Sequence, residues 1–205
     1  RAELAAAIQD LKRSRGAVIL AHNYQLPEIQ DLADYLGDSL ELSRKAAATE
    51  ANMIVFCGVH FMAQTAKILS PQRLVLLPDP AAGCPMADMI NPSQLAAFRA
   101  KYPGRPVVAY VNTTAEVKAD SDICCTSANS VRVVESLPDD EVLFIPDRYL
   151  AEWTQKQTGK RIIGYPGFCP THIPLTLEMI QEARAEHPQA VVMCHPECRP
   201  EVSEA

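Results

Sequence analysis

A run of apolar residues that ends in a polar loop carries the pattern that decides the fold: GAVILA at residues 16–21 passes directly into HNYQ at residues 22–25. The run is apolar throughout, which is typical of a strand buried on both faces of a parallel sheet. Comparable runs occupy residues 52–57, 73–77, 106–111, 122–125, 141–145, 161–165 and 190–194. Helical patterns, such as those at residues 27–37 and 91–104, separate the runs. The sequence therefore predicts an α/β fold whose parallel sheets are covered by helices.

Composition and charge narrow the class of protein. The chain has 205 residues, 48% of them hydrophobic, which is enough to bury a sizeable core. Its formal net charge is −6, so no basic surface indicates binding to nucleic acid or to an anionic membrane. Residues 1–14 have the pattern of an amphipathic helix rather than of a signal peptide, and no apolar run approaches the ~20 residues of a membrane span. We expect a cytoplasmic protein.

Polar residues cluster directly after three of the predicted strands. They are His22, Asn23 and Tyr24 in the first loop, Tyr110, Asn112 and Thr113 in the second, and His195 and Glu197 in the third. Ligands of open parallel sheets bind outside the carboxyl ends of the strands. Three loops that carry histidine, tyrosine, asparagine and glutamate therefore predict a binding site there.

These loops also recur at similar intervals, which indicates repeated small domains. A second repeated spacing also indicates repeated domains: the separation between Cys57 and Asp79 equals that between Cys125 and Asp147. We predict a first domain at residues 1–83, a second at 84–168, and the opening of a third at 169–205.

The seven cysteines do not form an obvious disulfide framework, because their number is odd and the sequence has no secretion signal. Cys57, Cys124 and Cys194 each end an apolar run, so they are expected to be buried and inert. Cys84 and Cys169 instead lie in loops rich in glycine and proline. If each repeated domain offers one thiolate to a shared centre, an iron–sulfur cluster fits the ligand type, although zinc remains possible.

The sequence resembles the quinolinate synthase family, the A protein of bacterial NAD biosynthesis. The resemblance covers residues 15–205 and is carried by AHNYQLPEIQDLADYLGDSLELS, FCGVHFMAQTAKIL, GCPMADM, YVNTTAEVKADSDICCTSAN, IPDRYLA and HPEC, in the family's order. It implies three αβα domains related by pseudo-threefold symmetry, with a [4Fe-4S] cluster held by one cysteine from each. By position, Cys84 and Cys169 are two of the ligands. The family's third cysteine follows a Ser-Thr-Ser-Gly-Met segment that this sequence does not contain, and neither Cys194 nor Cys198 matches it.

The resemblance also implies an activity. The family is a transferase that condenses iminoaspartate with dihydroxyacetone phosphate, losing phosphate and two waters to form quinolinate. Three thiolates on four irons leave one iron open as a Lewis acid. An aspartate oxidase or dehydrogenase supplies the imine in the family and is a possible functional partner.

Candidate residues for binding the anionic substrates follow from the same match. His22 resembles a family histidine that contacts carboxylate or phosphate, and Ser39 and Ser127 precede or open helices, where anions bind well. Asn112 offers a donor and an acceptor to a carboxylate. His172, three residues after Cys169, is expected to face the substrate rather than to bind iron.

Candidate acid–base residues come from the strand ends. A phenol at Tyr24 or Tyr110 can move a proton or hold an oxyanion, and Tyr24 matches a family acid–base residue. Glu197, beside His195, is the expected general base.

Two other functions are open. One is a small-molecule binding protein of the same fold without a cluster, and the other is a zinc hydrolase that uses Cys169, His172 and His195. The spacing of Cys194 and Cys198 also admits a regulatory disulfide.

Overall fold

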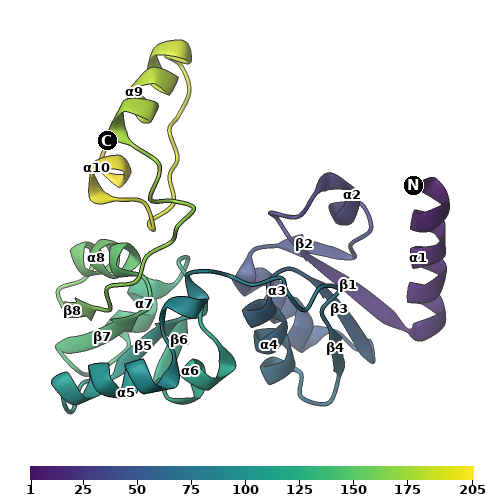
Figure 1. The fold of residues 1–205 in the computed structure, drawn as a ribbon, viewed down its shortest axis with the longest axis horizontal. Coiled ribbons are helices and arrows are strands. Elements are labelled where there is room, and N and C mark those ends of the chain that lie inside the picture. Colours follow the sequence, from purple (N-terminus) through teal and green to yellow (C-terminus); the bar gives the residue numbers. More distant parts are fainter. The chain divides into compact units, whose positions relative to one another are not determined.

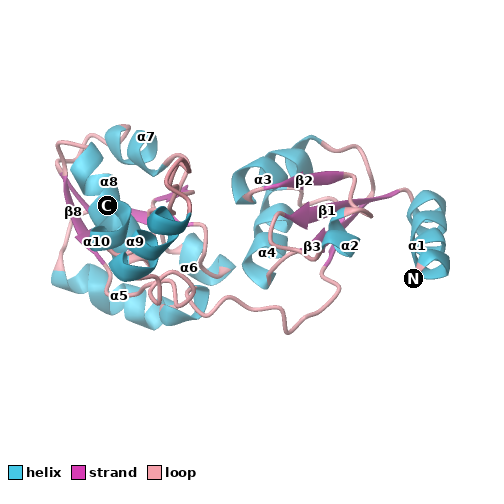
Figure 2. Ribbon diagram, turned by 90° about the horizontal axis from the view of Figure 1, so that it is seen from above, coloured by secondary structure: helices cyan, strands magenta, loops and turns pink.

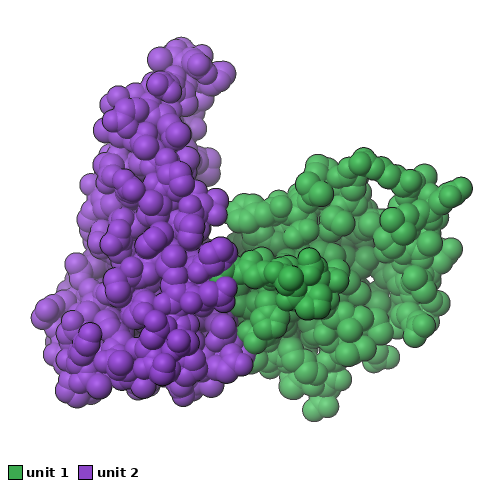
Figure 3. Space-filling view, in the orientation of Figure 1, with its two compact units in different colours: residues 1–84 green, residues 85–205 purple.

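The computed structural model describes all of residues 1–205, which divide into two compact units, Arg1–Cys84 and Pro85–Ala205 (Figure 3). The α/β prediction is confirmed, because each unit contains a four-stranded sheet whose strands are all parallel. The division into three domains stays a prediction. None of the helices combines the length and the apolar character that crossing a bilayer requires.

The sheet of the first unit has the order β2-β1-β3-β4 (Figure 1). Its strands are β1 (Ala17–His22), β2 (Tyr35–Gly37), β3 (Met53–Cys57) and β4 (Leu74–Leu76). The helices are α1 (Ala2–Arg15), α2 (Pro27–Gln30), α3 (Ser39–Ala48) and α4 (His60–Leu69). Side chains of α3 and α4 pack with those of β1 and β3 in one apolar core, which includes Leu20, Leu42 and Phe56. The strand end at His22 is therefore anchored by a buried strand.

The sheet of the second unit has the order β6-β5-β7-β8. Its strands are β5 (Val107–Tyr110), β6 (Ile123–Cys125), β7 (Glu141–Ile145) and β8 (Arg161–Gly164). The helices are α5 (Pro92–Lys101), α6 (Ala115–Ala119), α7 (Ser130–Glu135), α8 (Arg148–Gln157), α9 (Leu177–Glu186) and α10 (Pro200–Ser203), with a 3-10 turn η1 at Ala87–Met89. Figure 2 shows α5 and α6 on one side of this sheet and α7 and α8 on the other.

Local signals explain where several helices begin. At α5, Asn91 is the N-cap and accepts the amide hydrogen of Gln94, and Pro92 takes the first helical position, where its missing amide hydrogen costs nothing. At α3, Asp38 is the N-cap and accepts from the amides of Leu40 and Glu41, so Ser39 is the first helical residue rather than the cap.

Two predicted elements are wrong. Residues 27–37 do not form one helix, because Asp34 pairs with β1 instead: its amide donates to Ile19 (2.9 Å) and its carboxylate accepts from the Ile19 amide (2.8 Å). The chain after α2 thus becomes strand β2. Residues 190–194 do not form a strand, since no strand of the second unit pairs with them, and Val191 and Met193 are 86% and 90% exposed.

The two sheets repeat one connectivity, because in both the second strand of the unit lies at an edge beside the first, and the third and fourth follow on the other side. His22 and Asn112 correspond in this repeat, since they end and follow the first strands, β1 and β5. The second repeated spacing, from Cys57 to Asp79 and from Cys125 to Asp147, does not join corresponding strands of the two units. Cys57 ends the third strand of its unit, whereas Cys125 ends the second strand of the other.

Candidate functional site

Six of the predicted site residues gather in the second unit, although they come from four separate segments. Tyr110 ends β5 and Ser127 follows β6, both at the carboxyl ends of parallel strands. Cys169 and His172 lie in the loop after β8, and His195 and Glu197 lie in the turn that precedes α10. Side-chain contacts join all six into one connected cluster.

Glu197 is the centre of this cluster and is only 2% exposed. Its Oε2 lies 2.8 Å from Nδ1 of His172 and 3.6 Å from Nδ1 of His195. Burial by itself raises the pKa of Glu197, but the hydrogen bonds from His172 and Tyr110 and the charge of His172 outweigh burial and bring the pKa below its usual value. Glu197 is therefore a carboxylate at neutral pH.

His172 bridges the thiol and the carboxylate through a single nitrogen. Its Nδ1 lies 3.0 Å from Cys169 Sγ and 2.8 Å from Glu197 Oε2. The hydrogen bonds to Cys169 and then to Glu197 raise the pKa of His172 to about 10, against the opposite effect of burial. The imidazole is therefore a cation that holds two anionic or polar partners together.

His195 has the opposite character. Its Nδ1 accepts the amide hydrogen of Glu197 (3.3 Å), so Nε2 carries the proton and donates to Ser127 Oγ (3.2 Å). Burial lowers the pKa of His195 despite the nearby Glu197 carboxylate. The neutral ring stacks on His172, with centroids 4.9 Å apart.

Tyr110 completes the cluster as a neutral phenol. Burial, followed by the charge of Glu197, raises its pKa well above the ordinary value. Its hydroxyl lies beside Glu197 and Ser127, where it can donate to the carboxylate and accept from the serine.

Several buried acceptors beside the cluster have no hydrogen-bond partner. They are Asn112 Oδ1, Glu197 Oε1 and Asp147 Oδ2. Buried acceptors of this kind are costly unless a ligand or water supplies donors, so they are typical of a binding site. Asn112 is a predicted site residue. Asp147 is not: the sequence motif IPDRYL contains it, but a Pro-Asp pair before a helix also fits an ordinary N-cap.

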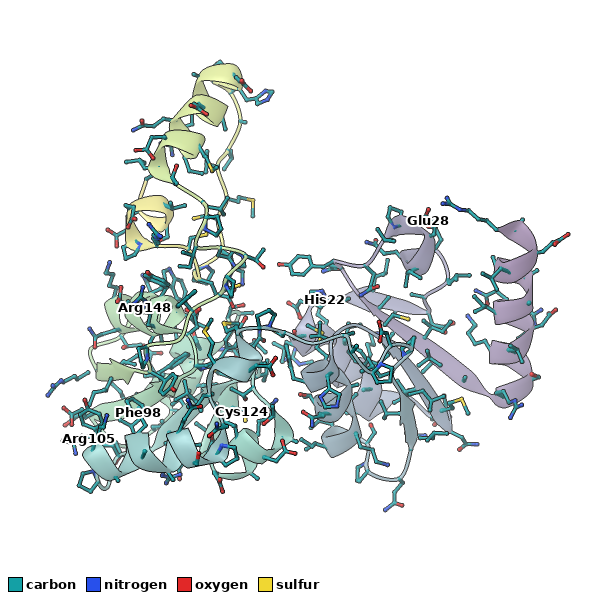
Figure 4. All side chains as sticks on the ribbon, in the orientation of Figure 1. His22, Glu28, Phe98, Arg105, Cys124 and Arg148 are labelled. Carbon is teal, nitrogen blue, oxygen red and sulfur yellow. The ribbon has the colours of Figure 1, made fainter.

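The predicted residues of the first unit lie at the carboxyl end of β1. His22, which is labelled in Figure 4, is buried by its accessible area, and its Nδ1 accepts the amide hydrogen of Tyr24 at 3.2 Å, which leaves the proton on Nε2. Burial lowers the pKa of His22, although Asp38 acts against it. Tyr24 is 80% exposed and its ring meets the His22 ring edge-on at 4.6 Å. Ser39, partly buried, opens α3.

The cysteines differ from expectation in their burial. Cys124 and Cys194 are exposed and Cys57 is partly buried, so the prediction of three buried thiols is wrong. Cys124 lies on the edge strand β6, and Cys194 lies in the segment that forms no strand, so neither has a second layer to cover it. Cys194 and Cys198 are both reduced, and Cys198 is buried.

Cys169, His172 and Glu197 are the residues of the second unit that could hold a metal, since their ligand atoms all lie within 4.8 Å of one another. Cys169 is only 9% exposed, and a soft, shielded thiol suits an iron–sulfur centre. The predicted zinc set that includes His195 does not fit, because both nitrogens of that ring are already engaged. A thiol hydrolase does not fit either: a nucleophile and an orienting acid need opposite nitrogens of the base, and here both meet Nδ1 of His172.

Comparison with known proteins gives a consistent answer. The family model described as "Quinolinate synthetase A protein" matches residues 6–205. A quinolinate synthase of Dehalococcoides mccartyi (strain ATCC BAA-2266 / KCTC 15142 / 195) is 62% identical over 196 residues, which are 96% of this chain and 65% of the relative. One from Desulforudis audaxviator is 58% identical over 201 residues, covering 98% of this chain and 66% of the relative. The chain thus spans about two thirds of the length of the curated relatives it matches.

Proposed function

The chain belongs to the quinolinate synthetase A protein family, and on that premise we propose that the protein condenses iminoaspartate with dihydroxyacetone phosphate to quinolinate, releasing phosphate and two waters. The reaction is redox-neutral, so it needs proton transfers and anion binding but no electron acceptor. The observation that carries the proposal is the buried carboxylate of Glu197, which lies 2.8 Å from Nδ1 of His172 and 3.6 Å from Nδ1 of His195, with Tyr110 beside it.

Glu197 is the proposed general base. Its Oε2 is held by His172, while Oε1 is buried without a partner and can accept a proton from a substrate carbon or nitrogen. Tyr110, a neutral phenol bonded to Glu197, is suited to donate a proton to a departing hydroxyl and to recover it through the carboxylate.

The remaining polar groups are proposed to bind the anions. His172 is a cation at neutral pH, and a carboxylate or phosphate within its reach is stabilised by that charge. Ser127 and Asn112 add hydrogen bonds, the latter through an amide whose oxygen has no partner. In the first unit, Nε2–H of His22, Tyr24 and Ser39 are proposed to contact the second substrate. The N-terminus of α3 is already capped by Asp38, so Ser39 would act there through its hydroxyl rather than through the helix amides.

A [4Fe-4S] cluster, when bound, supplies an electrophilic iron that polarises a substrate oxygen. Cys84 and Cys169 are the residues of this chain that would hold it, and the soft, shielded thiol of Cys169 fits that group. The cytoplasmic location and the supply of iminoaspartate by an oxidase or dehydrogenase remain parts of the proposal.

The test is quinolinate formation by the protein as its native host makes it, purified without oxygen and supplied with dihydroxyacetone phosphate and iminoaspartate formed in situ. Glu197→Gln keeps the shape of the side chain but removes the base, and we expect the rate to fall by about 10²–10⁴-fold. Glu201→Gln is the matched control, because Glu201 lies on the same segment with its side chain 53% exposed, and its rate should stay within about twofold of the parent.

Two outcomes would overturn the proposal. One is full activity in Glu197→Gln. The other is a parent protein that carries iron and binds dihydroxyacetone phosphate but forms no quinolinate. A parent that binds dihydroxyacetone phosphate with no iron would instead favour the cluster-free binding protein.

A further inference from the structure

The loop that leads into Cys169 is held on one side by the start of helix α8. The backbone of Asp147 forms an isolated parallel bridge with Gly167. A Cβ at Gly167 would collide with the Pro146 carbonyl oxygen, so only glycine fits this close approach. These contacts fix the middle of the loop, but no backbone carbonyl accepts the amide hydrogen of Phe168, the residue directly before the cysteine.

Met89 holds the loop from another side through three contacts. Its backbone carbonyl accepts the hydroxyl hydrogen of Tyr165 at 3.3 Å, and its thioether sulfur accepts the amide hydrogen of Phe168, also at 3.3 Å. Between these two contacts, the Cβ of Met89 lies 3.6 Å from the position that a Cβ of Gly167 would take. One residue thus touches the start, the middle and the end of the segment that precedes Cys169.

Met89 is itself anchored in the second unit. It ends the turn η1, and its amide donates to the Met86 carbonyl at 3.1 Å. Met86 and Ile90 are each 1% exposed, and Ile90 belongs to the apolar core of this unit. Tyr165 packs against the same core, where its ring meets that of Phe98 edge-on with centroids 5.5 Å apart. The contacts of Met89 therefore connect the loop to a buried part of the unit.

Packing alone does not account for a methionine at this position. Met89 is only partly buried, and a leucine would fill about the same volume. A leucine could not accept the amide hydrogen of Phe168, however, and a partly buried donor without an acceptor costs free energy. Sulfur is a weak acceptor, but it is the acceptor that this amide has.

We propose that Met89 is a positioning residue for Cys169: its carbonyl and its sulfur hold the two ends of the loop that presents the thiol. Met89 touches no reacting atom in this role. Because η1 follows Cys84 in the chain, the same residue attaches the Cys169 loop to the segment after the other predicted cysteine ligand. The importance of the role rests on the proposed function, in which Cys169 holds the cluster, but the contacts themselves do not depend on it.

The experiment measures amide hydrogen exchange at Phe168 and His172, together with the rate at which a chelator removes iron, in the anaerobically purified protein. The His172 amide donates to the Cys169 carbonyl at 3.1 Å and so reports on the turn of the cysteine. Met89→Leu keeps the bulk of the side chain but removes the acceptor. We expect exchange to speed up by about fivefold at Phe168 and by at least about twofold at His172, and iron to leave at least about twofold faster.

Two further variants separate the hydrogen bond from packing. Met86→Leu is the matched control, because it makes the same change on the same turn at a buried side chain that forms no hydrogen bond, and both exchange rates should stay within about twofold of the parent. Met89→Gln supplies a carbonyl acceptor at a similar reach and should restore the protection of Phe168. A residue that only filled space would not be rescued in this way.

Exchange at either amide that is equal in Met89→Leu and the parent overturns the proposal, as does an equal increase in Met86→Leu. If Met89→Leu does not fold, Met89→Ala replaces it, with Met86→Ala as its control. The parent also decides alone: a Phe168 amide that exchanges as fast as an exposed one excludes the contact. A protein that makes no quinolinate or carries no iron contradicts the proposed function, whereas the two exchange rates still decide the positioning role.

Discussion

At the scale of single residues, the sequence indicates which side chains lie in the polar loops, but it does not indicate which side chains contact one another. The sequence alone indicates that His195 and Glu197 belong to a polar loop after an apolar run, and that Cys169 and His172 share a loop. It does not reveal that Tyr110 lies against Glu197 or that Ser127 contacts His195, because those contacts join segments that are distant in sequence and depend on how the strands are ordered in the sheet. It also does not reveal that Cys169 and Glu197 share one nitrogen of His172.

A buried pair of hydroxyls between α7 and α8 allows a prediction about stability. Thr154 Oγ1 lies 2.8 Å from Ser130 Oγ, and both residues are fully buried. Thr154→Val keeps the shape but leaves the serine hydroxyl unpaired, so we expect a loss of about 1–3 kcal/mol in the free energy of unfolding, measured with urea. Adding Ser130→Ala to that variant removes the orphaned group, and part of the stability should return. A double variant that is as unstable as the sum of the single ones would contradict this account.

At the scale of elements, strands that have neighbours were predictable and the one that lacks them was not. The runs that became β1, β3, β5 and β7 are apolar except at their ends and lie beside other strands. The run at residues 190–194 has the same composition, yet it forms no strand, because hydrogen bonds to a partner define a strand and its sequence cannot supply the partner. Strand β2 could not be predicted because its own sequence pattern is helical. It becomes a strand since Asp34 accepts a hydrogen bond from Ile19 of β1 and the residues after it pair with β1.

The edge strand β6 allows a test of side-chain alternation with two adjacent thiols. Cys124, which is labelled in Figure 4, is exposed and Cys125 is buried, as expected for neighbours on opposite faces of a strand. Burial raises the pKa of both thiols, most strongly that of Cys125, and Lys118 partly offsets the effect at Cys124. When the folded protein is labelled with a maleimide and the peptides are quantified by mass spectrometry, Cys124 should react at least about tenfold faster than Cys125.

The same peptides provide the control for this labelling. In urea the two thiols are equivalent, and their rates should converge. Equal rates in the folded protein would mean that β6 does not hold the alternation described here.

At the scale of the whole molecule, the division into repeated units could be inferred from the spacing of the polar loops, but its register could not. The two units share one strand order, and His22 and Asn112 correspond in it. Cys57 and Cys125 have equal spacings to the next Pro-Asp pair although they do not end corresponding strands. Each α/β unit contains several strand–loop–helix segments of similar length, so spacing alone does not tell which segments correspond.

Each unit has an apolar core of its own, and this predicts separable responses to core substitutions. Leu42 belongs to the core of the first unit and Leu143 to that of the second, and both are fully buried. Leu42→Ala and Leu143→Ala should each cost about 2–5 kcal/mol, with faster amide exchange concentrated in the unit that carries the change.

Leu4→Ala is the control for these substitutions, because Leu4 is 66% exposed and the change should be nearly neutral. Faster exchange that spreads evenly over residues 1–205 in both core variants would show that the units open as one.

The turn after β1 and the turn before α10 hold their histidines alike: in each, the amide two residues further on donates to Nδ1, at 3.2 Å for His22 and 3.3 Å for His195. The tautomer of both rings is thus set by a hydrogen bond from the main chain rather than by a neighbouring side chain. Substitutions of the side chains around either ring can therefore change the pKa of the histidine, while the proton of the neutral ring stays on Nε2. Only a change that reshapes the turn itself would move it.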